Sequence, residues 1–111
     1  MKGKKMKKVK SYKEPDKKES IEILFIEVIK KAFADALAVG TVSDYSQSVV
    51  QSQAKSWLNI HNKNFKLICE QAGTEPEYII KLYEKLQYNY NSGKITKEQL
   101  KFGISRLDKK I

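Results

Sequence analysis

The chain has 111 residues, of which 41% are hydrophobic and 32% are charged, and its formal net charge is +9. A chain of this length is too short for two independent cores, so we expect one domain. Cys69 is the only cysteine, which excludes an intramolecular disulfide and fits a reducing compartment. The N-terminal residues lack the apolar stretch of a signal peptide, and charged side chains interrupt the longest apolar stretch, residues 21–39. We therefore expect a cytoplasmic protein with no membrane partner.

The positive charge is concentrated at the N-terminus. Residues 1–18 contain nine lysines and two acidic side chains, a net charge of +7, whereas the remaining 93 residues carry thirteen basic and eleven acidic side chains. Such a segment cannot bury enough apolar surface to offset the entropy lost on ordering. We therefore expect a disordered lysine-rich tail over residues 1–19 and a helical domain over residues 20–111.

The first predicted helix covers residues 20–39, with Ser20 as its cap and Gly40 as a left-handed stop. Its wider apolar face comprises Ile21, Phe25, Val28, Ile29, Ala32, Ala36 and Val39, and a second stripe comprises Ile23, Ile26, Phe33 and Leu37. Two such stripes need cover on more than one side. Either this helix is central in a bundle, or Ile26, Phe33 and Leu37 form a homodimer interface.

Four further helices follow from capping and turn signals. The second is predicted over residues 48–58, with Val50, Ala54, Trp57 and Leu58 facing inward. The third covers residues 65–72, is capped by Asn62 or Asn64 and ends at Gly73. The fourth begins after Thr74 as its cap, carries Pro76 in its first turn and extends to about residue 90.

The fifth helix opens with a capping box formed by Thr96 and Gln99, and its apolar line is Leu100, Ile104 and Leu107. No segment alternates apolar and polar residues for long enough to predict a strand. The sequence therefore predicts an all-α bundle of about five helices.

Residues 65–86 have the layout of a helix-turn-helix: a short helix, a glycine turn and a longer helix. An ordinary helical hairpin has the same packing requirements. Glu75 and Glu77 in the first turn of the second helix suit the helix dipole but repel phosphate. We therefore place the phosphate contacts of this helix further along, at Lys81 and Lys85.

The tail is the clearer indication of nucleic-acid binding, because lysines displace condensed counterions from a phosphate backbone. Anionic lipid binding and solubility are the alternatives, but no apolar partner accompanies the lysines as a membrane arm requires. Lys97, Lys101 and Arg106 either extend the basic surface or form a solvated helix face, and we favour the second interpretation. Tyr83, Tyr88 and Tyr90 either stack on exposed bases or cover the rim of the core, and again we favour the second. The predicted contacts in the tail are Lys2, Lys4, Lys5, Lys7, Lys8, Lys10 and Lys13.

The sequence argues against an enzyme. His61 is the only histidine, and the only thiol, Cys69, is predicted to be buried at a helix-packing position, where it is inert. There is no metal-ligand cluster, no glycine-rich phosphate loop and no carboxylate pair beside a base, so we expect no catalytic residue, no metal and no cofactor.

The order and spacing of several residues resemble those of a known family. The pattern runs Ala32-x-x-Asp35-Ala36, Ala54-x-x-Trp57-Leu58 and Phe65-x-x-x-Cys69-x-x-Ala72-Gly73-x-x-Pro76, and covers about residues 28–82. It is similar to small helical DNA-associated regulators of alphaproteobacteria, which occur among phage-derived regulators and in activators of gene transfer agent clusters. The resemblance implies a transcriptional regulator with a helix-turn-helix-like core.

The chain departs from that pattern at Thr74-Glu75 and over residues 79–81, where an arginine would be expected. Our first hypothesis is a small regulator that binds DNA, with duplex DNA as the expected form. The alternative is a non-enzymatic adaptor, or a homodimeric module, that docks on a protein of the transcription machinery.

Overall fold

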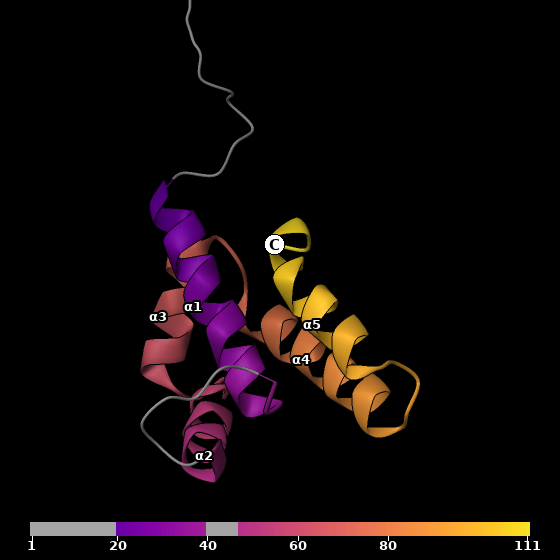
Figure 1. The fold of residues 1–111 in the computed structure, drawn as a ribbon. Helices are drawn as coiled ribbons and strands as arrows, with labels where there is room; N and C mark the ends of the chain where they lie inside the picture. The colour runs from indigo at the N-terminus through magenta and orange to yellow at the C-terminus, as the bar shows by residue number, and fades with distance from the viewer. Residues whose placement is uncertain (1–19, 40–46) are drawn as a thin grey trace, which may run out of the picture.

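A computed structural model describes residues 20–39 and 47–111, which form five α-helices and one short 3₁₀-helix (Figure 1). The elements are α1 (Ser20–Ala36), α2 (Gln47–Trp57), α3 (Lys63–Ala72), α4 (Pro76–Asn91), α5 (Lys97–Ser105) and η1 (Leu107–Lys109). The described part of the chain contains no strand, so the predicted all-α class is confirmed. The expected disordered tail falls on residues 1–19 and lies outside the described residues. None of the described helices is long and apolar enough to span a membrane.

Helix α1 is the central element of the bundle. It contacts α2, α3, α5 and η1, and it buries Ile26, Ile29, Phe33, Ala36 and Leu37 (Figure 1). The prediction of a central helix is confirmed, but the assignment of its faces is corrected. Because Ile26, Phe33 and Leu37 are buried within the single chain, they present no surface to a second copy. The wider face predicted for the core leaves Ile21 and Val28 exposed.

The end of α1 also differs from the prediction. The helix ends at Ala36, and Ala38 takes the left-handed conformation expected of Gly40, with a φ of 62°. The N–H of Val39 reaches back to the carbonyl of Ala34 over 2.9 Å, which closes a Schellman turn. Helix α1 therefore stops before Gly40, which lies outside the described residues. Ser20, predicted as the cap, is itself the first helical residue.

Helices α3 and α4 are joined at a glycine turn. The side chain of Asn62 caps α3 by accepting from the N–H of Phe65, and Gly73 ends it with a φ of 81°, both as predicted. Thr74, however, does not cap α4. Its N–H donates to the carbonyl of Cys69, so this residue still completes the turn that closes α3. The N-cap position of α4 is taken by Glu75, whose side chain forms no capping bond, and Pro76 follows in the first turn.

Helices α4 and α5 form an antiparallel hairpin. The predicted capping box is present, with Thr96 and Gln99 exchanging side-chain-to-backbone hydrogen bonds of 2.8 and 3.1 Å. The hairpin closes tightly at Gly103, where an added Cβ would lie 3.3 Å from a methyl group of Leu86. An edge-to-face contact between Phe33 and Tyr83, with ring centroids 5.4 Å apart, attaches α4 to the central helix.

The core is tightest around Phe33 and Phe65, which are fully buried. Trp57 is predicted from the sequence to face inward, but its ring is only half-buried: it packs edge-to-face on Phe65 at 5.1 Å and donates to Asn64 Oδ1 over 2.7 Å. The indole sits at the rim because its N–H needs a polar partner, which the inside of this core lacks.

This difference in burial predicts a difference in stability. Phe33→Ala should lower the free energy of unfolding by about 3–5 kcal/mol, the usual cost of a buried aromatic truncation. Trp57→Ala should cost clearly less, because part of the ring is already in water. Urea unfolding of the two variants checks the order, and equal destabilisation would show that the rim contact is as important as the centre.

An ion pair links the C-terminal 3₁₀-helix to α1. Lys30 Nζ lies 3.0 Å from a carboxylate oxygen of Glu27 and 3.3 Å from one of Asp108. Desolvation opposes ionisation of both partners, but the hydrogen bonds and charges of the pair dominate. They lower the pKa of Asp108 below its ordinary 3.8 and raise the pKa of Lys30 above 10.5.

The lowered pKa of Asp108 fixes the sign of a pH effect. Its contribution to stability is present above the carboxyl's unfolded-state pKa and is lost as the pH falls through the lower folded-state pKa. Because this carboxylate is 40% exposed, Asp108→Asn should cost less than about 1 kcal/mol at neutral pH. The difference from wild type should shrink toward about pH 2–3 in urea titrations. Glu98→Gln is the matched control, since Glu98 is exposed and unpaired among the described residues.

Candidate nucleic-acid interface

The sequence assigns phosphate contacts to the tail and to α4. The seven tail lysines, from Lys2 to Lys13, lie outside the described residues. Lys81 and Lys85 are both exposed on α4, one turn apart, so the structure brings these two together on one side of the helix. Glu77 and Glu84 lie on an adjacent side of the same helix and are also exposed. Helix α4 alone therefore presents a surface of mixed charge.

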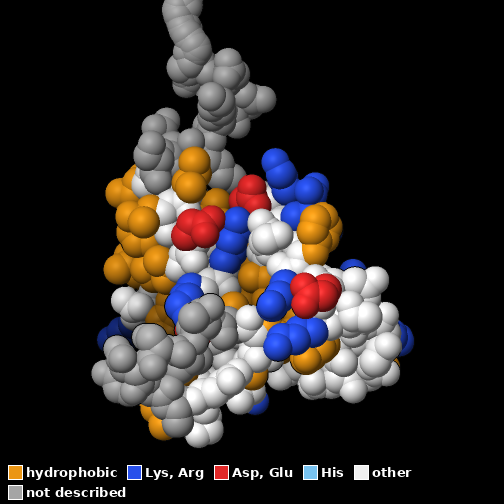
Figure 2. Space-filling view, in the orientation of Figure 1, with side chains coloured by type: hydrophobic (Ala, Val, Ile, Leu, Met, Phe, Trp, Pro, Cys, Tyr) orange, Lys and Arg blue, Asp and Glu red, His pale blue; other side chains and the backbone are white. Residues whose placement is uncertain are grey.

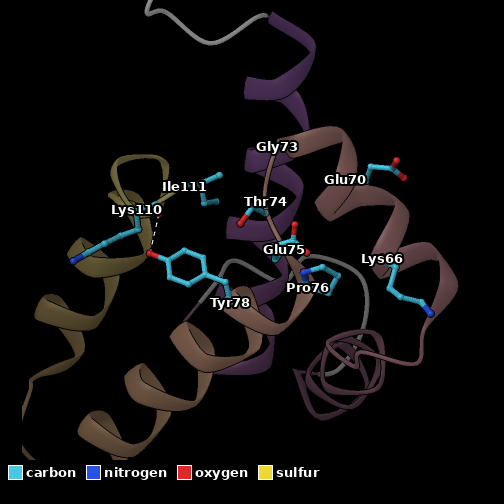
Figure 3. Close-up of a pocket in the computed structure, with 9 residues that line it drawn as sticks. All are labelled: Lys66, Glu70, Gly73, Thr74, Glu75, Pro76, Tyr78, Lys110 and Ile111. Atoms are coloured by element: carbon cyan, nitrogen blue, oxygen red, sulfur yellow. Dashed lines mark hydrogen bonds between the residues drawn. The ribbon is translucent and has the colours of Figure 1, made fainter.

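The first turn of α4 is unsuited to an anion. Glu75 at the N-cap and Glu77 in the first turn are both exposed and place two carboxylates where a helix-turn-helix reader would meet phosphates. Beside this turn is an open hollow of about 610 Å³, between the α3–α4 connection and the C-terminus (Figure 3). Its lining residues are Lys66, Glu70, Gly73, Thr74, Glu75, Pro76, Tyr78, Lys110 and Ile111.

The hollow carries charges of both signs and offers no concentrated positive site. Lys66 and Glu70 extend away from it in Figure 3, whereas the hydroxyl of Tyr78 donates to the carbonyl of Lys110 over 2.9 Å. That hydrogen bond attaches the end of the chain to α4. The hollow is accordingly better explained as the seam between two packed segments than as a ligand site.

A more coherent surface lies on the outside of the α4–α5 hairpin. Helix α4 buries Ile79 and Tyr83, and α5 buries Leu100 and Ile104. The residues opposite these buried pairs, at helical spacing, are exposed on both helices. The two helices pack side by side (Figure 1), so we consider their outward sides together. We call this surface the hairpin face: Lys81, Lys85 and Tyr88 of α4, with Phe102 and Arg106 of α5. The exposed carboxylates of Glu84 and Glu98 lie one turn before Tyr88 and Phe102 on the same helices.

Two aromatic rings stand out on this face. Tyr88 and Phe102 are each 62% exposed, and Phe102 lies off the buried line of α5. Each ring has a cation over it. Lys94 Nζ lies 5.0 Å from the centroid of Tyr88, and the guanidinium of Arg106 lies 5.3 Å from that of Phe102. Each of the two exposed rings of the hairpin therefore has a cation beside it.

The hairpin also carries the excess positive charge of the described fold. Residues 76–111 contain eight basic and four acidic side chains, whereas residues 20–39 and 47–75 together contain five of each. Figure 2 shows Lys and Arg side chains over α5 and the C-terminal end and also over α1, whose outer side is covered by apolar side chains. Lysine and arginine in excess on one side give an electrostatic footprint for a polyanion.

The described residues hold no cluster of metal-ligating side chains, and their one thiol is buried. No group of three or more His, Cys, Asp or Glu side chains is placed to hold a metal ion there. Cys69 is buried, as the sequence predicts. Burial, reinforced by the charges of Glu75 and Glu77, raises the pKa of its thiol to about 12, so the nucleophilic thiolate is suppressed at neutral pH.

Sequence reasoning missed Phe102 and Arg106 as a pair. It groups Arg106 with Lys97 and Lys101 as a solvated face and gives Phe102 no role. The signal that could have found them is an aromatic residue off the buried line of the fifth helix, followed four residues later by a cation. Conversely, Tyr88 is expected at the rim of the core but is largely exposed.

Comparison with known proteins adds no relative: no family model, curated protein or solved structure matches the chain.

Proposed function

We propose that the chain is a small DNA-binding protein that serves as a transcriptional regulator. The observation that carries the proposal is the hairpin face, where exposed cations and rings lie on the part of the described fold with the largest excess of positive charge. Lys81 and Lys85 lie on this face and supply phosphate contacts. The polar and charged character of the surface suits a polyanion better than a second apolar partner.

The lysine-rich N-terminal segment adds to this surface. With a net charge of +7 over residues 1–18, it supplies affinity that is independent of base sequence and falls steeply with salt. The folded domain then orients the complex through the hairpin face. In this arrangement the α3–α4 unit is helix-turn-helix-like in layout, but its acidic first turn is unsuited to the role of base reader.

A salt series of DNA binding tests the proposal. Removing residues 1–18 should weaken binding strongly at low salt and flatten the dependence of log affinity on log salt. Loss of each phosphate contact changes that slope by roughly 0.9 for duplex DNA. The double substitution Lys81→Ala and Lys85→Ala should weaken binding to all sequences about equally, because lysine on phosphate carries no base information.

The matched control replaces two exposed lysines on another side of the domain, Lys63→Ala with Lys66→Ala, which changes the net charge equally. This variant should retain more affinity than the Lys81 and Lys85 variant. Equal weakening of DNA binding by the two variants would show that the effect depends on net charge and not on the position of the lysines. Absence of binding to duplex and single-stranded DNA at low salt would refute the proposal.

A second candidate function, a protein-interaction adaptor or homodimer, is favoured by the outer side of α1. There Ile21, Leu24 and Val28 follow helical spacing and are 56%, 61% and 38% exposed. Figure 2 shows apolar side chains covering this side of the molecule. An exposed apolar stripe of this kind marks a candidate protein-contact surface.

Sedimentation at micromolar concentration tests the homodimer form of this candidate. Under that candidate wild type should sediment as a dimer, and Leu24→Glu should sediment as a monomer with unchanged helical content, because Leu24 is outside the core. Ile26→Val, a conservative change inside the core, is the control and should remain dimeric. A monomer for wild type would exclude self-association and leave docking on another protein.

A further inference from the structure

We infer that the hairpin face binds single-stranded nucleic acid by stacking unpaired bases on Phe102 and Tyr88, with the surrounding cations on the phosphates. The inference rests on the proposed function and specifies the form of nucleic acid that the same site takes. Lysines alone would bind any polyanion. The two exposed rings can in addition stack on bases, which are accessible in a single strand.

The first step is the exposure of the rings. The ring of Phe102 is 62% exposed and contributes little to the core. It lies on the side of α5 opposite the buried Leu100 and Ile104, which keeps it exposed. Tyr88 is exposed to the same degree on the neighbouring helix. Stacking needs one flat side of a ring for a base, and every base has such a side whatever its identity. Because a cation lies over one side of each ring, the base would take the opposite side.

The second step is the position of the cations. Arg106 and Lys94 each lie over a ring, at 5.3 and 5.0 Å from the centroid, so a base stacked beside either ring would have a positive charge close to its phosphate. Lys81 and Lys85 extend the same exposed side along α4. This combination is that of single-strand binding surfaces, in which basic side chains follow the backbone and aromatic rings hold the bases.

Duplex DNA fits these rings less well, because its bases are already stacked and paired within the helix. An anionic lipid surface also fits less well. A membrane-binding helix needs a continuous apolar side with flanking cations, whereas the outside of α5 places Glu98 and Gln99 near Phe102.

The experiment compares a thymidine oligomer of about 15 nucleotides, within the span that single-strand binding domains cover, with a duplex of equal length. Full-length protein is used in a salt series. Phe102→Leu and Tyr88→Leu remove a ring and keep every charge. Each should weaken binding to the single strand by roughly 5- to 140-fold, the value of one stacked base, and should leave the salt slope unchanged. Arg106→Gln should instead reduce that slope by about 0.7, as expected when one phosphate contact on a single strand is removed.

A direct signal of stacking comes from Phe102→Trp in a Trp57→Phe background, where the new indole is the only one in the chain. Its fluorescence should be quenched by the thymidine oligomer and much less by the duplex. Thermal melting controls for folding, since replacement of an exposed ring should leave the melting temperature nearly unchanged.

The outcomes separate the two proposals. Binding to duplex and single strand with equal affinity, unaffected by either leucine substitution, would overturn the stacking inference and leave the DNA-binding function standing. Absence of binding to both would overturn the function and the inference together. Binding to vesicles of anionic lipid that depends on Phe102, with no binding to the thymidine oligomer, would replace nucleic acid by a membrane surface as the ligand.

Discussion

The fold depends on the need to cover helix α1. More than half of this helix is apolar, and among the described helices no other is as rich in large aliphatic side chains. Four other elements pack around it, and Phe33, in its C-terminal half, contacts the ring of Tyr83 on α4. Burial of such a helix dominates the stability of a small domain, because few other apolar surfaces are present. The positions of α2, α3 and the α4–α5 hairpin follow from this requirement.

The way in which the other elements cover α1 also determines which surfaces of the domain remain exposed. The helix has a second apolar side, with Ile21 and Leu24 exposed, and the described elements leave that side uncovered. The hairpin, by contrast, uses narrow buried lines of two residues on each helix, so most of its surface remains free for charge. The molecule therefore has an apolar side on α1 and a basic, ring-bearing side on the hairpin. These sides correspond to the two proposed functions, protein docking and DNA binding, and a protein that uses both could hold a nucleic acid and a partner at once.

The turn between α3 and α4 shows how local chemistry limits function. Gly73 and Thr74 close α3, which leaves Glu75 at the N-cap position of the next helix. Acidic residues at this end stabilise the helix through its dipole, and their negative charge makes the same end a poor anion site. In the described domain, the largest excess of positive charge lies instead over residues 76–111, where Lys81 follows Glu77 by one turn. The acidic residues that stabilise α4 therefore lie in its first turn, whereas its lysines lie further along the helix.

Local signals in the sequence determined most of the helices. Asn62, Gly73 and the Thr96–Gln99 box act on their own neighbours in the chain, so their consequences are visible without tertiary structure. The sequence left a central helix and a homodimer interface open for α1, because both of its stripes are apolar and periodicity cannot tell which one the other helices will cover.

The same limit applies to the candidate site. Lys81 and Lys85 were identified from their charge, whereas Phe102 and Arg106 lie on the other helix of the hairpin, which packs closely on Leu86 at Gly103. Capping and turns are contacts within a few residues, so the sequence alone determines them. The hairpin face combines residues of two helices, so it depends on how those helices pack in the tertiary structure.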